Sequence, residues 1–214
     1  MILAFNAKQL CTGKVNAHRH INQRDLGMGA LDACMHNLPV FLQLTDLRLM
    51  MGSSAVHSDM LMWHPEELVE NAAVQIQNIL FAVPQISVRL AELPPEHRKM
   101  LGFWMQFIRE HRQLLAAPIR AESPHQLYPL VRARCGNEAI IAVYEAGHIS
   151  EIDDAETVWI INAADPRGII VDAPFACHAA LFDCMGESAG WQPTEPGLQR
   201  LSVPLGGYAQ LTKA

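Results

Sequence analysis

The chain has 214 residues, of which 50% are apolar and 18% are charged, and its formal net charge is −6. This length allows one large domain or two small ones with a real core, and the composition excludes an intrinsically disordered chain. The negative charge argues against nucleic acid or an anionic membrane surface as a partner. No apolar run approaches the ~20 residues that a membrane-spanning helix needs.

The cysteine pattern and the N-terminal residues bear on the cellular compartment of the protein. Five scattered cysteines without CxxC spacing favour free thiols over a disulfide framework. The apolar start Met1–Phe5 is too short for a secretory signal, and Lys8 soon interrupts it. We therefore expect a cytoplasmic protein. Cys177, His178 and Cys184 lack a fourth ligand and a regular spacing, so we predict no metal, and we predict no cofactor either.

The first legible element is a helix over Leu38–Met51, preceded by the loop Leu31–Asn37 that contains Asp32. Its apolar positions recur at helical spacing: Val40, Phe41, Leu44, Leu47 and Met51. A Gly-Ser-Ser break follows at Gly52, and Ala55–His57 then reads as a short buried strand.

A polar and aromatic cluster follows that strand: His57, Ser58, Asp59, Trp63 and His64. Pro65, Glu66 and Glu67 next mark the start of a helix that extends to about Phe81. Its apolar stripe is Leu68, Ala72, Ile76, Ile79, Leu80 and Val83, opposite Glu67, Asn71, Gln75 and Asn78. Polar groups between a strand and the next helix are where α/β enzymes keep their chemistry.

A second strand and a third helix complete this region. Ile86–Leu90 alternates as a strand does, and the pair Pro94–Pro95 opens a helix with Trp104 and Phe107 on its core face. Strands that alternate with helices predict a parallel sheet. Two strands cannot form a stable parallel sheet alone, so we expect either a truncated chain or a homo-oligomer that supplies further strands, and we favour truncation.

After residue 117 the pattern changes to short strands separated by turn residues, which predicts an antiparallel β domain over 118–214. The expected strands are Tyr128–Arg134, Ala139–Glu145, Thr157–Asn162, Gly168–Asp172 and Leu198–Leu205. The predicted domains are therefore 1–117 and 118–214.

The segment Asp46–His64, with the string HSDMLMW, resembles melibiase-type α-galactosidases of glycoside hydrolase clan D, family 36-like. The resemblance continues through Asn78–Leu90, the Pro95-Glu-His-Arg-Lys-Met string and Phe103–Arg112. It implies an α/β fold, namely the C-terminal half of a (β/α)8 TIM barrel followed by an antiparallel β-sandwich. Ala55–His57 would be strand seven and Ile86–Leu90 strand eight.

The resemblance also implies a site and a substrate, an α-galactoside or a related oligosaccharide. Asp32 would be the catalytic acid/base, while Asp59, His57, Trp63 and Arg89 would bind the sugar. The relatives' Asp-Cys-Pro-Asn-Asp-like string is Asp-Ala-Cys-Met-His-Asn here, and their Lys-Trp-Asp-like nucleophile motif is absent. Retaining glycosidases need two carboxylates about 5–5.5 Å apart, so we expect the fragment alone to be inactive.

Each of these residues could instead have a purely structural role. Asp32 can make an Asx turn or cap a helix, and Asp59 can interact with the dipole of the following helix. His57 can be a core histidine, Trp63 can pack on the next helix, and Arg89 can form a structural salt bridge instead of orienting Asp59 or Asp32. The alternative function is a non-catalytic remnant, or a carbohydrate-binding or interaction domain.

Overall fold

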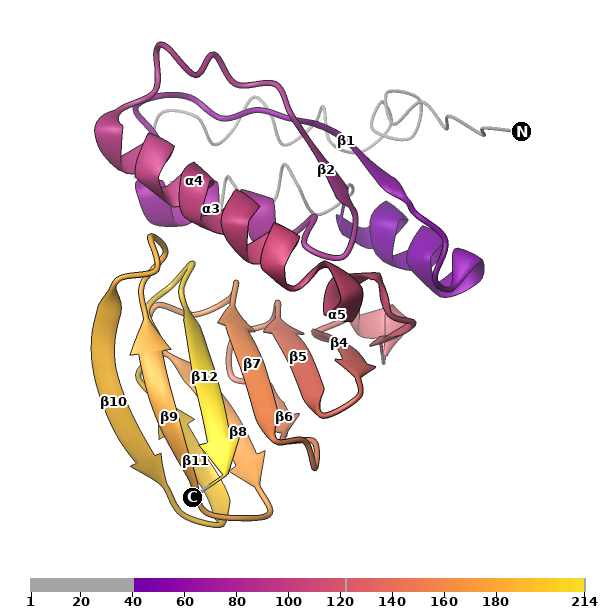
Figure 1. Ribbon diagram of the computed structural model, residues 1–214, viewed down its shortest axis with the longest axis vertical. Coiled ribbons are helices and arrows are strands. Elements are labelled where there is room, and N and C mark those ends of the chain that lie inside the picture. Colours follow the sequence, from indigo (N-terminus) through magenta and orange to yellow (C-terminus); the bar gives the residue numbers. More distant parts are fainter. Residues whose placement is uncertain (1–40, 122, 214) are drawn as a thin grey trace.

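The computed structural model describes residues 41–121 and 123–213 (Figure 1). Its helices are a segment over 41–51, α3 (Val69–Gln77), α4 (Pro95–Glu110), α5 (Arg112–Ala116) and the 3₁₀ turn η2 (Pro124–Gln126). Of these, α3 and α4 lie between a two-stranded sheet and a seven-stranded sheet (Figure 1). A mixed α/β chain is confirmed, and no sheet among the described residues closes into a barrel.

The small sheet pairs β1 (His57–Leu61) in parallel with β2 (Val83–Ile86). Parallel pairing is what the alternation of strands and helices predicts. The boundaries differ from the prediction, however. β1 begins where the strand over Ala55–His57 was expected to end, and β2 lies upstream of most of Ile86–Leu90.

The seven-stranded sheet has the order β10-β9-β12-β7-β5-β4-β3. Its strands are β3 (Ile119–Ala121), β4 (Leu130–Cys135), β5 (Glu138–Val143), β7 (Thr157–Asn162), β9 (Cys177–Phe182), β10 (Ser188–Thr194) and β12 (Tyr208–Lys213). A three-stranded sheet of order β11-β8-β6 contains β6 (Ile149–Glu151), β8 (Ile169–Ala173) and β11 (Gly197–Leu201). The expected antiparallel pairing fails twice, because β5–β7 and β6–β8 are parallel.

The strand β5 shows where the two hydrophobic cores lie. Ile140 and Ala142 belong to a core shared with the helices, while Ala139, Ile141 and Val143 belong to a core shared with β8 and β11. Successive side chains of a strand point to opposite faces, so both faces of the seven-stranded sheet are covered here. The helix-side core includes residues from before and after residue 117, such as Trp104 and Ile161.

Helix α3 is buried on nearly every side, which corrects the predicted two-faced helix. Asn71 and Gln75, expected on the solvent face, are buried, while Leu68 is 61% exposed at the N-cap. The reason is contact with α4 and with the β strands: on the strand side, Gln77 Nε2 donates to the Gly206 carbonyl at 2.6 Å, and the Tyr144 hydroxyl donates to the Gln77 carbonyl at 2.8 Å. α3 thus joins the α/β part to the β strands.

Helix α4 contributes three aromatic side chains to the core and its edge. Trp104 and Phe107 are buried as predicted, and Trp104 Nε1 donates to the Cys184 carbonyl at 3.0 Å. Phe103 is only partly buried, and its ring stacks on that of Tyr208 with centroids 5.7 Å apart. Offset and edge-to-face ring contacts of this kind add to the stability that burial provides.

Candidate functional site

The string His57–Trp63 lies along β1 and just beyond it, so His57, Ser58 and Asp59 lie within a strand, while Trp63 and His64 follow it. The pairing of β1 with β2 shifts register between His57 and Met60. At that irregularity the Ser58 hydroxyl accepts a hydrogen bond from the Gln85 backbone N–H at 2.8 Å. Irregularities of this kind commonly re-aim side chains next to functional sites.

The predicted site residues are only partly placed. Asp32 lies outside the described residues, and for Asp59 the structure describes the backbone, within β1, but not the side chain. His57 opens β1 and its side chain is exposed.

Trp63 is 8% exposed and takes part in a buried hydrogen-bond chain. Its Nε1 donates to His97 Nδ1 at 2.9 Å, and His97 Nε2 lies 3.0 Å from the Glu67 carbonyl. An indole N–H can only donate and a carbonyl can only accept, so His97 must carry its proton on Nε2. The indole is therefore buried and bonded to the start of α4, whereas the alternative to sugar stacking placed Trp63 against the helix that directly follows it.

Arg89 follows β2 in a loop and does not end a strand as predicted. Its Nη1 donates to Glu92 Oε1 at 3.0 Å, and both side chains are exposed. An exposed pair of this kind contributes little to stability. Among the described residues, the partner of Arg89 is thus Glu92.

A cavity of about 500 Å³ lies at the other end of the small sheet, where β1 and β2 begin. It is bounded by the residues just before β1 and β2, by the end of helix 41–51, and by the junction of α4 and α5. The apolar part of the lining includes Val56, Leu80, Val83, Ile108 and Leu115. Its charged lining residues are Arg48, Arg109 and Arg112.

Arg48 forms one wall of this cavity and is only 2% exposed. Its Nη1 donates to the carbonyls of Gly52 (2.5 Å) and Ser54 (3.2 Å), and its Nη2 to those of Leu115 (3.2 Å) and Ala117 (2.8 Å). The guanidinium therefore caps the carboxyl ends of helix 41–51 and α5 together, where helix carbonyls lack partners. Burial lowers the pKa of Arg48 from its ordinary value.

Sequence reasoning missed Arg48. The predicted stripe placed Leu47 and Met51 in the core, but the buried positions are Phe41, Leu44, Thr45 and Arg48. These residues fit the same helical period after a rotation of about one position. The only signal in the sequence was a charged residue between two leucines, Leu47 and Leu49. The role of Arg48 is revealed by its bonds to the carbonyls of residues 115 and 117, which the sequence pattern does not connect to it.

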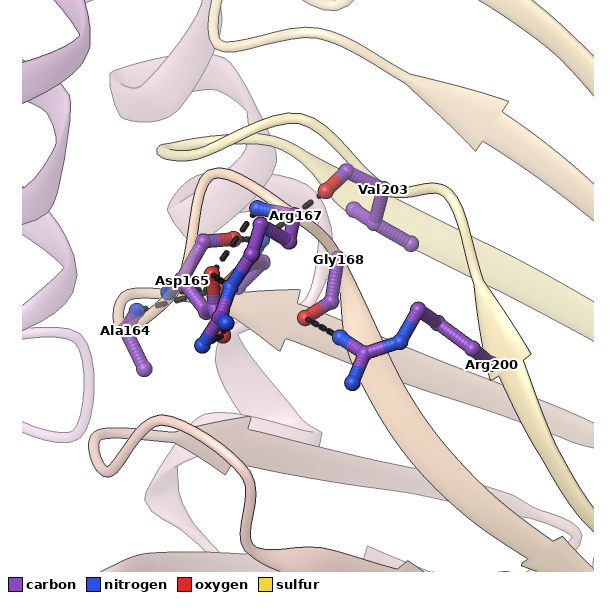
Figure 2. Close-up of polar contacts among 7 residues, drawn as sticks. Ala164, Asp165, Arg167, Gly168, Arg200 and Val203 are labelled. Carbon is purple, nitrogen blue, oxygen red and sulfur yellow. Dashed lines mark hydrogen bonds and ion pairs between the residues drawn. The ribbon is translucent and has the colours of Figure 1, made fainter.

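A second polar cluster, in the turn after β7, is structural (Figure 2). The Asn162 side-chain amide donates to the carbonyls of Asp165 (2.7 Å) and Val203 (2.9 Å), and Asn162 Oδ1 accepts from the Asp165 N–H at 3.1 Å. The Arg167 guanidinium pairs with the buried Asp165 carboxylate (Nη2–Oδ2 2.8 Å) and holds its pKa below the usual range. Each of these polar groups is therefore satisfied by the turn itself or by the neighbouring Val203 carbonyl.

Comparison with known proteins finds no family model, no curated protein and no solved structure that matches the chain. Within the described ranges, no three His, Cys, Asp or Glu side chains gather closely enough to hold a metal ion. No helix over residues 41–121 or 123–213 combines the length and the apolar character needed to cross a bilayer.

Proposed function

We propose that the chain contributes the seventh and eighth strands, and the β domain that follows them, to a melibiase-type α-galactosidase. The observation that carries this proposal is the pair β1–β2, because the HSDMLMW string lies on and just after a strand that pairs in parallel with the next one. The helix α3 connects them. Consecutive strand–helix–strand units of this kind build (β/α)8 barrels.

The small size of the β1–β2 sheet supports the proposal that further strands extend it. A parallel pair of this size is too small to be stable by itself. The missing strands would come from another segment or from a second copy of the chain, which makes a homo-oligomer part of the proposal. The free thiols Cys135, Cys177 and Cys184 support a reducing compartment such as the cytoplasm.

The proposed reaction is retaining hydrolysis of terminal α-galactosides. One carboxylate attacks the anomeric carbon, and the second protonates the leaving oxygen and then activates water. In this scheme Asp32 is the acid/base, the Asp59 carboxylate accepts hydrogen bonds from sugar hydroxyls, and His57 forms a hydrogen bond with a sugar hydroxyl. No Lys-Trp-Asp-like nucleophile string occurs in the sequence, so the chain alone binds sugar without turning it over.

One observation favours the second candidate, a non-catalytic remnant or carbohydrate-binding domain. Trp63 and Arg89, two of the four expected sugar contacts, are occupied by His97 and Glu92. A site that uses its aromatic platform and its cation for internal contacts offers fewer groups to a sugar.

The test combines sugar binding with turnover by the purified chain. Saturation-transfer NMR with methyl α-galactoside is expected to show binding that methyl α-glucoside does not reproduce and that Asp59→Asn weakens by roughly tenfold, as loss of a charged hydrogen-bond acceptor predicts. Glu66→Gln, an exposed change just after the motif, is the matched control.

Hydrolysis of a nitrophenyl α-galactoside is measured together with the mass in solution. No turnover alongside sugar binding supports the proposal. Turnover by 1–214 that vanishes on Asp32→Asn contradicts the claim that the chain alone is inactive. Absence of any galactoside binding by a folded chain contradicts the sugar site as a whole.

A further inference from the structure

The cavity at the amino ends of β1 and β2 has an unusual balance of charge for a chain of net charge −6. Its described lining contains three arginines and no aspartate or glutamate. Arg109 belongs to the last turn of α4, and Arg112 opens α5. Both are exposed, and neither guanidinium forms an ion pair or hydrogen bond with residues 41–121 or 123–213.

Arg48 adds a buried positive charge to the same cavity. Its four acceptors are all neutral backbone carbonyls, so no carboxylate neutralises it among the described residues. Its Nε is buried and lacks a hydrogen-bond partner there. Arg48 therefore adds an uncompensated positive charge beside the cavity, which would favour an anion bound there.

The remaining lining residues indicate what else a bound anion would contain. Apolar side chains and backbone from the segment after α3, from β2 and from the α4–α5 region supply most of the surface, with Ser53, Ser54 and Gln113 as the neutral polar groups. A volume of about 500 Å³ is within the range of small-molecule sites, which are mostly apolar with a few placed polar groups. Arginine binds carboxylate and phosphate groups through its planar fork.

We propose that this cavity binds a small amphiphilic anion, in which an apolar body fills the space beside Leu80, Val83 and Ile108 and a single carboxylate or phosphate meets Arg109 and Arg112, near the buried charge of Arg48. Of the proposed sugar contacts, His57 adjoins this lining at Val56 and Val83, whereas Trp63 and Arg89 lie beyond the far ends of β1 and β2. The two proposals are tested with different ligands, so failure of one does not decide the other.

The test is calorimetric titration of the full chain with benzoate and with phenyl phosphate at low ionic strength. Saturable binding of one or both is expected, and the stronger of the two identifies the anionic group. Benzamide and phenol, which keep the ring without the charge, are expected to bind at least about tenfold more weakly. Added salt is expected to weaken the binding of the anions and to leave the binding of the neutral compounds unchanged.

Variants at exposed positions connect the binding to this cavity. Arg109→Gln with Arg112→Gln is expected to weaken anion binding by roughly tenfold or more. Arg98→Gln, on an exposed position of α4 outside the lining, is the matched control and is expected to change binding less than about twofold. Ala55→Phe, which adds volume to the lining, is expected to abolish binding while all three arginines remain.

Three results would overturn the proposal. The first is no saturable binding of either anion, and the second is equal binding of benzoate and benzamide. The third is an equal loss of binding in Arg98→Gln and in the double variant, since that would reflect general attraction of anions and not this cavity.

Discussion

Trp63 illustrates what a single residue type can and cannot reveal. The string that contains it is polar and aromatic, and such strings suit both sugar stacking and packing. What decides between them is a partner 34 residues away, because His97 accepts the indole N–H inside the core. No spacing rule connects residues in different elements, so this pairing was not predictable from the sequence.

Replacing Trp63 with phenylalanine tests that contact. Trp63→Phe keeps an aromatic ring but leaves His97 Nδ1 without its buried donor, so the free energy of unfolding should fall by about 1–3 kcal/mol. Urea denaturation measures the change. Trp191→Phe is the control, since Trp191 is 72% exposed and its loss should change stability by less than about 0.5 kcal/mol. Equal losses in the two variants would rule out the buried hydrogen bond as the cause.

At the scale of elements, the sequence located the helices and most strands but misplaced their boundaries and faces. Thr157–Asn162 coincides with β7, because a run of β-branched residues between turns is a strong local signal. By contrast, β3, β6, β9, β10 and β12 were not expected. Their residues include alanine, glycine and proline, which have low strand propensity, and their pairing with distant strands decides their structure.

The turn that joins β7 to β8 allows a sharp test of backbone placement. Gly168 has φ +99°, and a Cβ there would lie 2.1 Å from the Leu201 carbonyl oxygen of β11. Gly168→Ala should therefore lower the free energy of unfolding by about 2–4 kcal/mol, through strain and overlap together. Chemical denaturation measures this loss.

Gly136, in the turn between β4 and β5, is the matched control. It also has a positive φ, +58°, but nothing lies within 4 Å of an added Cβ. Gly136→Ala should cost about 1 kcal/mol, the backbone part alone. If the two substitutions destabilise the chain equally, the close approach of Gly168 to Leu201 is not what limits that turn.

At the scale of the whole molecule, the three tyrosines report on the packing between helices and strands. The pKa of Tyr128 is raised to about 12, first by its hydrogen bond to Asp46 (2.5 Å), and that of Tyr208 to about 12, first by burial. Burial also raises the pKa of Tyr144. Each folded-state pKa lies above the unfolded value near 10, so these groups add stability below pH ~10 and lose it as pH rises from ~10 to ~12.

Alkaline titration followed by the absorbance of tyrosinate tests this expectation. The folded chain should show little tyrosinate at pH ~10.5, where a chain unfolded in guanidinium is more than half ionised. Asp46→Asn should let one tyrosine, Tyr128, ionise at lower pH than in the parent chain. Free titration of all three tyrosines near pH ~10 in the folded chain would contradict the packing around them.

The overall arrangement was predictable only in outline. Alternation gave the parallel pair β1–β2, and the short strands gave a β-rich second part. The continuous core across residue 117 was not predictable, because it depends on α3 having two buried sides, and the polar residues Asn71 and Gln75 suggested a solvent face. Polar side chains enter a core when partners are available, as the 2.7 Å contact between Asn71 Nδ2 and Glu67 Oε1 illustrates.

The position of β12 has a consequence for synthesis of the chain on the ribosome. Residues 208–213 form an inner strand that joins β7 to β9. Until residue 213 has left the exit tunnel, β7 and β9 each present an unpaired edge, and the seven-stranded sheet exists as two separate pieces. Unpaired edges are templates for pairing with other chains. Release from the ribosome, or enough residues beyond 213 to span the tunnel, is therefore the step that commits this chain to its fold.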